Sequence, residues 1–232
     1  MIPTVQQLLK PPFIMVVHVR DTTPSRTLLL FGHIDLSFDE AAFHKLRTSL
    51  HATRASHQWV FDTIAELPLC FSALRERNSD IFTDSRLSLL QDLNGWINSE
   101  KPSLSPFVLP NILLNPLVVI AQLLQYSSYL KLTCPTTVDD RHLHATTQHN
   151  TETLGFCTGL LSAFAVSAST GDEQLRKHGA TAIRLAMLIG AAVDAQEAPE
   201  KSGPSQSFSA AWHSQEQRTY LTNELEDLGT VG

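Results

Sequence analysis

Residues 151–169 read TETLGFCTGLLSAFAVSAS, and this stretch decides the fold. It contains the pentapeptide Gly155-Phe156-Cys157-Thr158-Gly159, which is followed by an apolar run rich in small residues. Two glycines around a nucleophile at the start of a helix are typical of a nucleophile elbow, in which neighbouring backbones approach a residue held in a strained turn. The stretch therefore predicts that a thiol, that of Cys157, stands at the start of a helix.

The chemistry of such an elbow depends on the backbone around the cysteine. Oriented N–H groups at the start of the helix would favour the thiolate of Cys157, and the backbone N–H of Thr158 is placed to donate to an oxyanion. A five-residue pattern also occurs by chance, and cysteine is often just a small buried apolar residue. Cys157 is the candidate nucleophile, Thr158 the candidate oxyanion donor, and Gly155 and Gly159 complete the motif.

The chain before this motif is mostly helical in its pattern. Residues 26–34 (RTLLLFGHI) form a compact apolar run that predicts a buried strand. Apolar residues at helical spacing predict helices, with a kink or break at Pro68 in the second of them. These helices cover residues 37–52, 58–77, 84–97 and 109–132, and a further helix is predicted from residue 172 to about residue 196.

Residues 133–150 are rich in Thr, Asp, His and Gln, and this composition predicts a solvated polar loop. The loop contains Asp139 and Asp140, and it also holds three histidines with partial His-x-His spacing, His142, His144 and His149. No cysteine or carboxylate pair of ligand quality accompanies the histidines, so we predict solvated side chains and no metal site.

Composition excludes several classes of protein. The 232-residue chain is 43% hydrophobic, has a formal net charge of −6, and contains no basic stretch suited to nucleic acid. Cys70, Cys134 and Cys157 are widely spaced without a CxxC pair, which indicates free thiols in a reducing compartment. No signal or transit peptide is indicated, and the most apolar window, residues 113–124, is too short to span a membrane. We therefore expect a cytoplasmic protein without membrane or nucleic-acid partners.

Four stretches carry a resemblance to a known family. The chain resembles the starter-unit acyl carrier protein transacylase (SAT) domain of fungal non-reducing polyketide synthases, most closely the C-methylating subgroup. The stretches are LLLFGHIDLSFDE at residues 28–40, DSRLSLLQDLNGWI at 84–97, LPNILLNPLVVIAQLLQYSSYLKL at 109–132, and the elbow stretch with its continuation GATAIRLAMLIGAAVDAQ at 179–196.

The resemblance implies an acyltransferase fold. Its large subdomain is helix-rich and of α/β-hydrolase type, and a ferredoxin-like small subdomain follows the nucleophile helix. On this basis residues 1–198 are the predicted large subdomain, residues 199–206 a linker rich in Pro, Ser and Gly, and residues 207–232 the start of a truncated small subdomain. We expect this last part to be incomplete and poorly packed.

The resemblance also implies the reaction. Cys157 would take a starter acyl group from CoA or an acyl carrier protein and pass it to the carrier domain of a polyketide synthase. The phosphopantetheine belongs to these substrate thioesters, and no bound cofactor is expected. Relatives that load malonyl groups hold the substrate carboxylate with an arginine in the nucleophile helix. Residues 160–173 contain no arginine, so acetyl or another short neutral acyl group is the expected starter.

The expected base is missing from the pattern. The family uses a histidine from a Gly-rich loop far beyond the cysteine, whereas only His178 and His213 follow Cys157 here. His178 is expected on an exposed helix face. His213, and His33 beside the predicted oxyanion loop, remain weak candidates for the base, so catalytic activity stays open.

Two other functions therefore stay open as alternatives. The first is a catalytically impaired remnant or interaction module of a polyketide synthase. The second is a cysteine hydrolase, which is disfavoured because residues 144–154 (HATTQHNTETL) are too polar for the buried strand that should lead into its elbow.

Overall fold

The helices and strands of the computed structural model lie in residues 14–19, 26–32, 40–75, 81–98, 109–134, 140–148 and 151–196, which are the residues it describes. All of them belong to one unit, residues 1–196, and residues 197–232 form another. The predicted linker and small subdomain thus lie outside the described residues. The elements in chain order are β1 (Ile14–Val19), β2 (Arg26–Phe31), α1 (Glu40–Ala52), α2 (Arg54–Arg75), α3 (Asp84–Asn98), α4 (Asn111–Thr133), α5 (Arg141–Gln148), β3 (Thr151–Gly155), α6 (Gly159–Ser167) and α7 (Asp172–Gln196).

The three strands form one mixed sheet with β2 in the middle. β1 runs antiparallel to β2 with Ile14 opposite Phe31, and β3 runs parallel to β2 with Phe31 opposite Gly155. Alternate residues of β2 are buried, namely Thr27, Leu29 and Phe31, because this side of the sheet faces the helices. β2 confirms the predicted strand, whereas β1 was not predicted.

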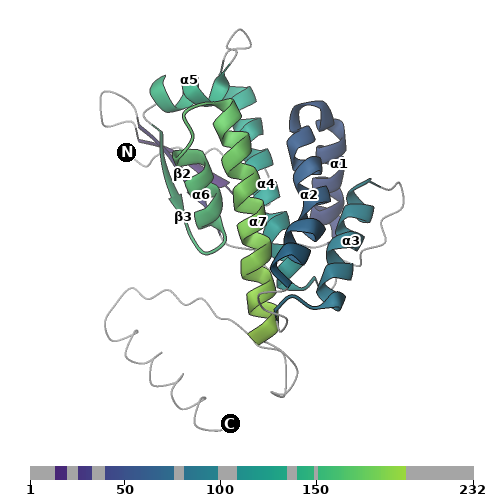
Figure 1. The fold of residues 1–232 in the computed structure, drawn as a ribbon. Coiled ribbons are helices and arrows are strands. Elements are labelled where there is room, and N and C mark those ends of the chain that lie inside the picture. The colour runs from purple at the N-terminus through teal and green to yellow at the C-terminus, as the bar shows by residue number, and fades with distance from the viewer. Residues whose placement is uncertain are drawn as a thin grey trace, which may run out of the picture. The chain divides into compact units, whose positions relative to one another are not determined.

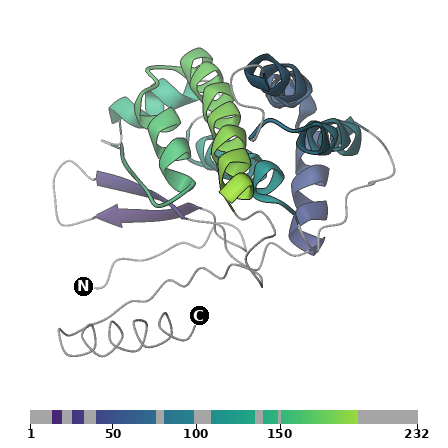
Figure 2. The ribbon, with the colours of Figure 1, turned by 60° about the horizontal axis from the view of Figure 1, so that its bottom comes forward.

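Helices α4 and α7 pack along each other in the middle of the fold (Figure 1). α6 lies between this pair and the sheet, while α1, α2 and α3 lie on the opposite side, as the rotated view also shows (Figure 2). Close packing is possible because α7 carries Gly190 where a Cβ would lie 2.4 Å from the backbone carbon of Asn111.

Helix α4 is long and apolar enough to cross a membrane by length and composition, yet 78% of its most apolar window is buried inside the fold. This agrees with the predicted core helix. Its first turn is held by Asp194 of α7, whose carboxylate accepts hydrogen bonds of 2.9 Å from the N–H groups of Asn111 and Ile112. An acid at this position satisfies N–H groups that have no partner within the helix and complements the positive end of the helix dipole.

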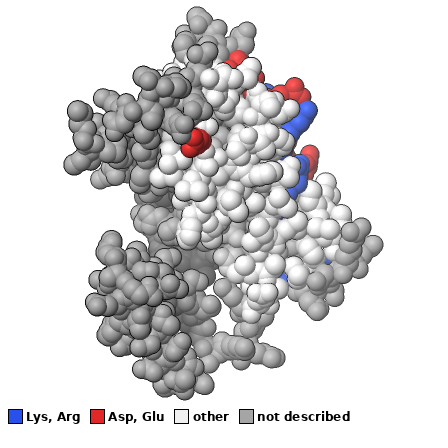
Figure 3. All heavy atoms as spheres, turned by 90° about the vertical axis from the view of Figure 1, so that its left-hand side faces the viewer, with Lys and Arg blue, Asp and Glu red and all other residues white. Residues whose placement is uncertain are grey.

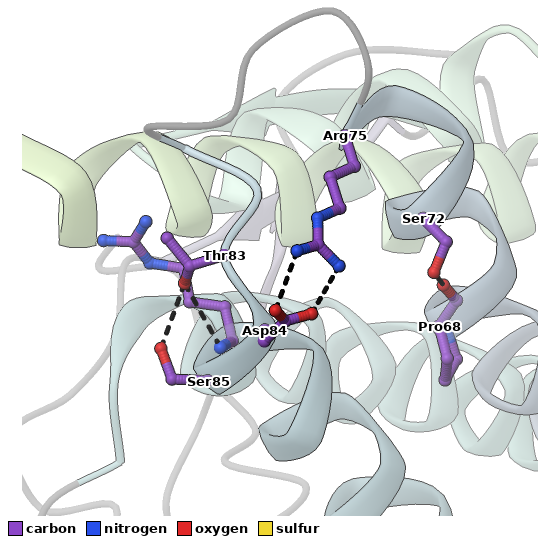
Figure 4. A network of polar contacts seen from close by, with 7 residues as sticks. Pro68, Ser72, Arg75, Thr83, Asp84 and Ser85 are labelled. Carbon is purple, nitrogen blue, oxygen red and sulfur yellow. Dashed lines mark hydrogen bonds and ion pairs between the residues drawn. The ribbon is translucent and has the colours of Figure 1, made fainter.

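The predicted break at Pro68 is wrong. α2 continues through Pro68, and the only non-helical backbone angles inside α2 are at His57 (φ −122°, ψ 25°). Pro68 removes one backbone donor, but Leu67 and Phe71 beside it are fully buried and hold the helix in place. Past the proline, Ser72 donates to its carbonyl oxygen across 2.9 Å (Figure 4).

The end of α2 is joined to the start of α3 by an ion pair. The guanidinium of Arg75 binds both carboxylate oxygens of Asp84, with 2.7 Å between Nη2 and Oδ2 (Figure 4). Both side chains are largely exposed, and exposed pairs typically contribute no more than about 1 kcal/mol. The pair therefore links the end of α2 to the start of α3 but contributes little to the stability of the fold.

The polar loop predicted over residues 133–150 is wrong for the part that the structure describes after residue 140, because residues 141–148 form α5. His142 is fully buried rather than solvated. Asp140 is half-buried, and its carboxylate accepts hydrogen bonds from the N–H groups of Leu143 and Asp172, at 2.9 and 3.0 Å. The polar residues of this segment thus satisfy helix starts inside the fold. His149 lies outside the described residues.

Candidate active site

The elbow predicted from the sequence is present. β3 ends at Gly155, a turn covers the next three residues, and α6 begins at Gly159. Cys157 has φ 55°, and it is the only non-glycine residue with a positive φ in the described part of the chain. A side chain in the left-handed region is strained, and such residues are frequent at functional sites. The position of Cys157 at the start of a helix is therefore confirmed.

The two flanking glycines allow backbones to meet closely. A Cβ at Gly155 would lie 2.5 Å from the carbonyl oxygen of Gly159, and a Cβ at Gly159 would lie 2.5 Å from that of Gly32. A Cβ at Gly159 would also collide with the carbonyl oxygen of Phe31. Gly155 thus lets the end of β3 approach the start of α6, and Gly159 lets the start of α6 approach the end of β2.

The thiol of Cys157 is exposed, and its Sγ lies 3.9 Å from Oγ1 of Thr158. Hydrogen bonds close the turn from Gly159 N to Phe156 O and from Leu160 N to Cys157 O, both at 3.0 Å. The N–H of Thr158 has no acceptor among the described residues. An exposed thiol and a backbone N–H without an acceptor among the described residues therefore occupy adjacent positions of the turn.

The end of β2 is tied to the elbow by polar contacts that the sequence analysis missed. The N–H of Phe156 donates to the carbonyl oxygen of Phe31 across 3.0 Å. Gln122 of α4 donates from Nε2 to the carbonyl oxygen of Gly32 at 2.7 Å and accepts from Oγ of Ser162 at 2.5 Å. Gln122 and Ser162 are fully buried. The signal that could have revealed them is a glutamine inside the apolar run of α4.

Four large apolar side chains are exposed around the elbow, each between 60% and 66% accessible. We call them the β3–α6 surface: Leu154, Phe156, Leu160 and Phe164. The face of the molecule that carries β3 and α6 shows few Lys, Arg, Asp or Glu side chains in its described part (Figure 3). The surroundings of the thiol are thus apolar and weakly charged.

The candidate bases are not tested by this geometry, because His33 and His213 both lie outside the described residues. Among the described histidines, none forms a hydrogen bond with Cys157. His178, expected on an exposed face, is half-buried and shares a hydrogen bond of 3.0 Å with Oγ of Ser169.

A pocket of about 290 Å³ lies apart from the elbow, among the ends of α2, α4, α5 and α7. Its lining includes the cationic side chains of Lys131, Arg141 and Arg176 but not Cys157. Within the described ranges, no group of three His, Cys, Asp or Glu side chains could hold a metal ion. The pocket lining therefore adds no residue to the elbow.

Comparison with known proteins shows the family of the chain. Residues 29–226 match the family described as starter unit:ACP transacylase in aflatoxin biosynthesis (SAT). The chain is 42% identical over 214 residues to the non-reducing polyketide synthase pigA of Monascus ruber, which covers 92% of this chain. It is 43% identical over 203 residues to the 3-methylorcinaldehyde synthase tropA of Talaromyces stipitatus, a match that covers 86% of this chain. It is 41% identical over 198 residues to a citrinin polyketide synthase of Monascus purpureus, a match that covers 85% of this chain. The chain spans about 8% of the length of each of these relatives. The chain belongs to the SAT family of fungal non-reducing polyketide synthases.

Proposed function

We propose that this chain loads a starter acyl group onto the carrier domain of a polyketide synthase through a thioester on Cys157. The family assignment supports starter-unit acyl transfer as the general role. The observation that carries the assignment to Cys157 is its strained turn: an exposed thiol with φ 55° between β3 and α6, next to the N–H of Thr158.

The proposed reaction consists of two thioester exchanges. The thiolate of Cys157 attacks the carbonyl carbon of acyl-CoA or of an acyl carrier protein, and a tetrahedral oxyanion forms. The carbon–sulfur bond to the departing thiolate then breaks, and that thiolate takes up a proton. In the second exchange the phosphopantetheine thiol of the carrier loses a proton, attacks the acyl-enzyme and releases Cys157. One thioester replaces another, so the site mainly supplies orientation and oxyanion stabilisation.

A short neutral starter such as acetyl fits these surroundings. α6 contains no Lys or Arg that could hold a carboxylate, and the β3–α6 surface is apolar. Among the described residues after Cys157, the first basic side chain is Arg176, which lines the separate pocket. A neutral acyl group therefore suits the site better than malonyl. The substrates bring their own phosphopantetheine, and we propose a cytoplasmic setting in which CoA thioesters are available.

Two alternatives follow from other observations. An impaired remnant or interaction module of a synthase is favoured by the absence of a histidine partner for Cys157 among the described residues. A cysteine hydrolase was disfavoured because the segment before Gly155 is too polar for a buried strand. Residues 151–155 do form β3, but alternate residues are exposed and none is fully buried, so this objection to a hydrolase stands. The family match now favours transfer to a carrier thiol over transfer to water.

The direct test is to incubate the purified chain with acetyl-CoA and hexanoyl-CoA and follow its intact mass. We expect an acyl adduct that maps to Cys157, is lost in Cys157→Ala, and persists in the matched control Cys70→Ala, which removes another thiol that is not buried. Addition of the carrier domain with its phosphopantetheine should then discharge the adduct. No adduct in the wild-type chain, or an adduct that persists in Cys157→Ala, would refute the proposal.

A further inference from the structure

Gln122 is an unusual residue for the centre of a core helix. It is fully buried, and the residues on both sides of it in α4, Ala121 and Leu123, are buried and apolar. A buried amide without hydrogen bonds is costly, and Gln122 avoids this cost with two bonds. One bond goes to the carbonyl of Gly32 at the end of β2, and the other comes from Ser162 in α6. A single side chain therefore connects the two backbones that meet at the elbow.

Both contacts of Gln122 lie close to Cys157 along the backbone. Gly32 is the carbonyl that Gly159 approaches, and Ser162 lies one turn into the helix that Gly159 starts. The neighbouring bond from Phe156 N to Phe31 O ties the same two segments together on the other side of the turn. The relative position of the end of β2 and the start of α6 is thus fixed at three places.

The bond to Gly32 holds the carbonyl group at the end of β2 in one orientation. An oxyanion binds best to donors that are already in position before the reaction, and here one donor, the N–H of Thr158, lies on the α6 side of the contact.

We infer that Gln122, held by Ser162, is a positioning residue that sets the spacing between the end of β2 and the N–H of Thr158 and so prepares the site for the oxyanion. This inference rests on the proposed acyl transfer. Gln122 does not touch the thiol itself and acts through the backbone. A small displacement of a catalytic group can slow a reaction by as much as about 100-fold, so the loss of Gln122 should be visible in the rate.

The test compares two reactions of the same thiol in the full 232-residue chain. Acetylation by acetyl-CoA passes through an oxyanion, whereas alkylation by iodoacetamide does not. We expect Gln122→Met to acetylate Cys157 about 10- to 100-fold more slowly than the wild type, with an alkylation rate within about twofold. Ser162→Ala keeps the contact between Gln122 and Gly32 but removes the bond that holds Gln122, so its acetylation rate should fall less than that of Gln122→Met. This second variant also tests the inference if Gln122→Met fails to fold.

The matched control is Gln125→Met. Gln125 also lies on α4 and uses its side-chain amide to bind backbone, accepting from the N–H of Ile14 at 3.0 Å, but this bond leads to β1 and not to the elbow. We expect normal acetylation in the control. Normal acetylation in Gln122→Met, or an equal fall of acetylation and alkylation, would overturn the inference while the proposed function stands. A wild-type chain that alkylates but never acetylates would overturn both.

Discussion

The hydroxyl of Tyr126 donates a hydrogen bond of 2.9 Å to Nδ1 of His142 inside the fold, where both side chains are fully buried. The other ring nitrogen of His142, Nε2, lies 3.0 Å from the carbonyl oxygen of Ser169 and must carry the proton, since a carbonyl only accepts. Burial, together with the nearby Tyr129, raises the pKa of Tyr126, so its hydroxyl stays a neutral donor. α4, α5 and the turn before α7 are thus joined through one histidine.

The variant Tyr126→Phe should lower the stability of the fold. It removes the hydroxyl and leaves Nδ1 of His142 buried without a partner, which typically costs about 1–3 kcal/mol of unfolding free energy. Urea unfolding of the wild type and the variant measures the difference. Tyr126→Phe combined with His142→Leu should lose less than the two single variants together, because neither polar atom is then left alone. A Tyr126→Phe variant as stable as the wild type would contradict the prediction.

Two glycine-to-alanine substitutions distinguish the effect of a close backbone contact on stability from the effect of helix propensity. Gly159→Ala places a Cβ against the backbone carbonyls of Phe31 and Gly32, which have little room to move, and we expect a loss of about 1–3 kcal/mol. Gly95→Ala, on an exposed face of α3 with no atom within 4 Å of the new Cβ, should instead stabilise the fold by about 0.5–1 kcal/mol. The denaturant midpoints of both variants, compared with that of the wild type, test this prediction. Equal shifts of the same sign in the two variants would refute it.

Cys157→Ser tests whether the site depends on the intrinsic reactivity of sulfur. An alcohol needs a positioned base, which typically contributes about 10²–10⁴ in rate, and no described histidine bonds to residue 157. We expect acyl loading to fall by about 100-fold or more. Because the side chain is exposed, the unfolding free energy should change by less than about 0.5 kcal/mol. A serine variant that loads at the wild-type rate would show that a competent base reaches this position.

The stability of the fold should depend on pH through His57. Burial lowers the pKa of His57 and the nearby charges of Lys131 and Arg176 lower it further, while its hydrogen bond to the Thr53 carbonyl raises it. The unfolded chain therefore binds this proton more tightly than the folded chain does. The contribution of neutral His57 is fully present above the ordinary pKa of 6.5 and is lost as the pH falls towards the lowered value.

The variant His57→Gln tests the expected direction of the change in stability with pH. Urea unfolding at about pH 7.5 and about pH 5.5, on either side of the ordinary histidine pKa, should show a smaller acid-induced loss of stability in the variant than in the wild type. The glutamine can still bond to Ser127, which lies 3.0 Å from Nε2 of His57, so packing changes little. The same loss in both proteins would assign the pH dependence to other groups.

The sequence allowed the elbow to be predicted because its signal is local. Two glycines around Cys157 and a run of small apolar residues after it specify the turn and the helix without reference to the rest of the chain. The same holds for α3 and α4, whose apolar spacing or continuous apolarity marks a helix directly. The family resemblance was carried by these same stretches and is confirmed by the comparisons.

Residues whose partners are distant in sequence were misjudged. His142 looked solvated because its neighbours are polar, yet its partners Tyr126 and Ser169 lie 16 and 27 residues away. Gln122 is marked in the sequence only as a glutamine within an apolar run, and its partner could not be predicted because its contact with Gly32 spans 90 residues. The segment before Gly155 was judged too polar for a buried strand, and β3 is indeed a strand with alternate residues exposed and none fully buried. The backbone pairing of β3 with β2, rather than hydrophobicity, creates that strand.

The place of β3 at the end of the described sheet affects how the protein behaves in solution. The apolar side chains of Leu154 and Phe156 are exposed there. We expect copies of the chain to associate through these side chains beside Cys157, and light scattering should report a growing average mass as protein concentration rises. The thiol would become less accessible in such assemblies, so the alkylation rate per molecule should fall with concentration. Dilution would restore it.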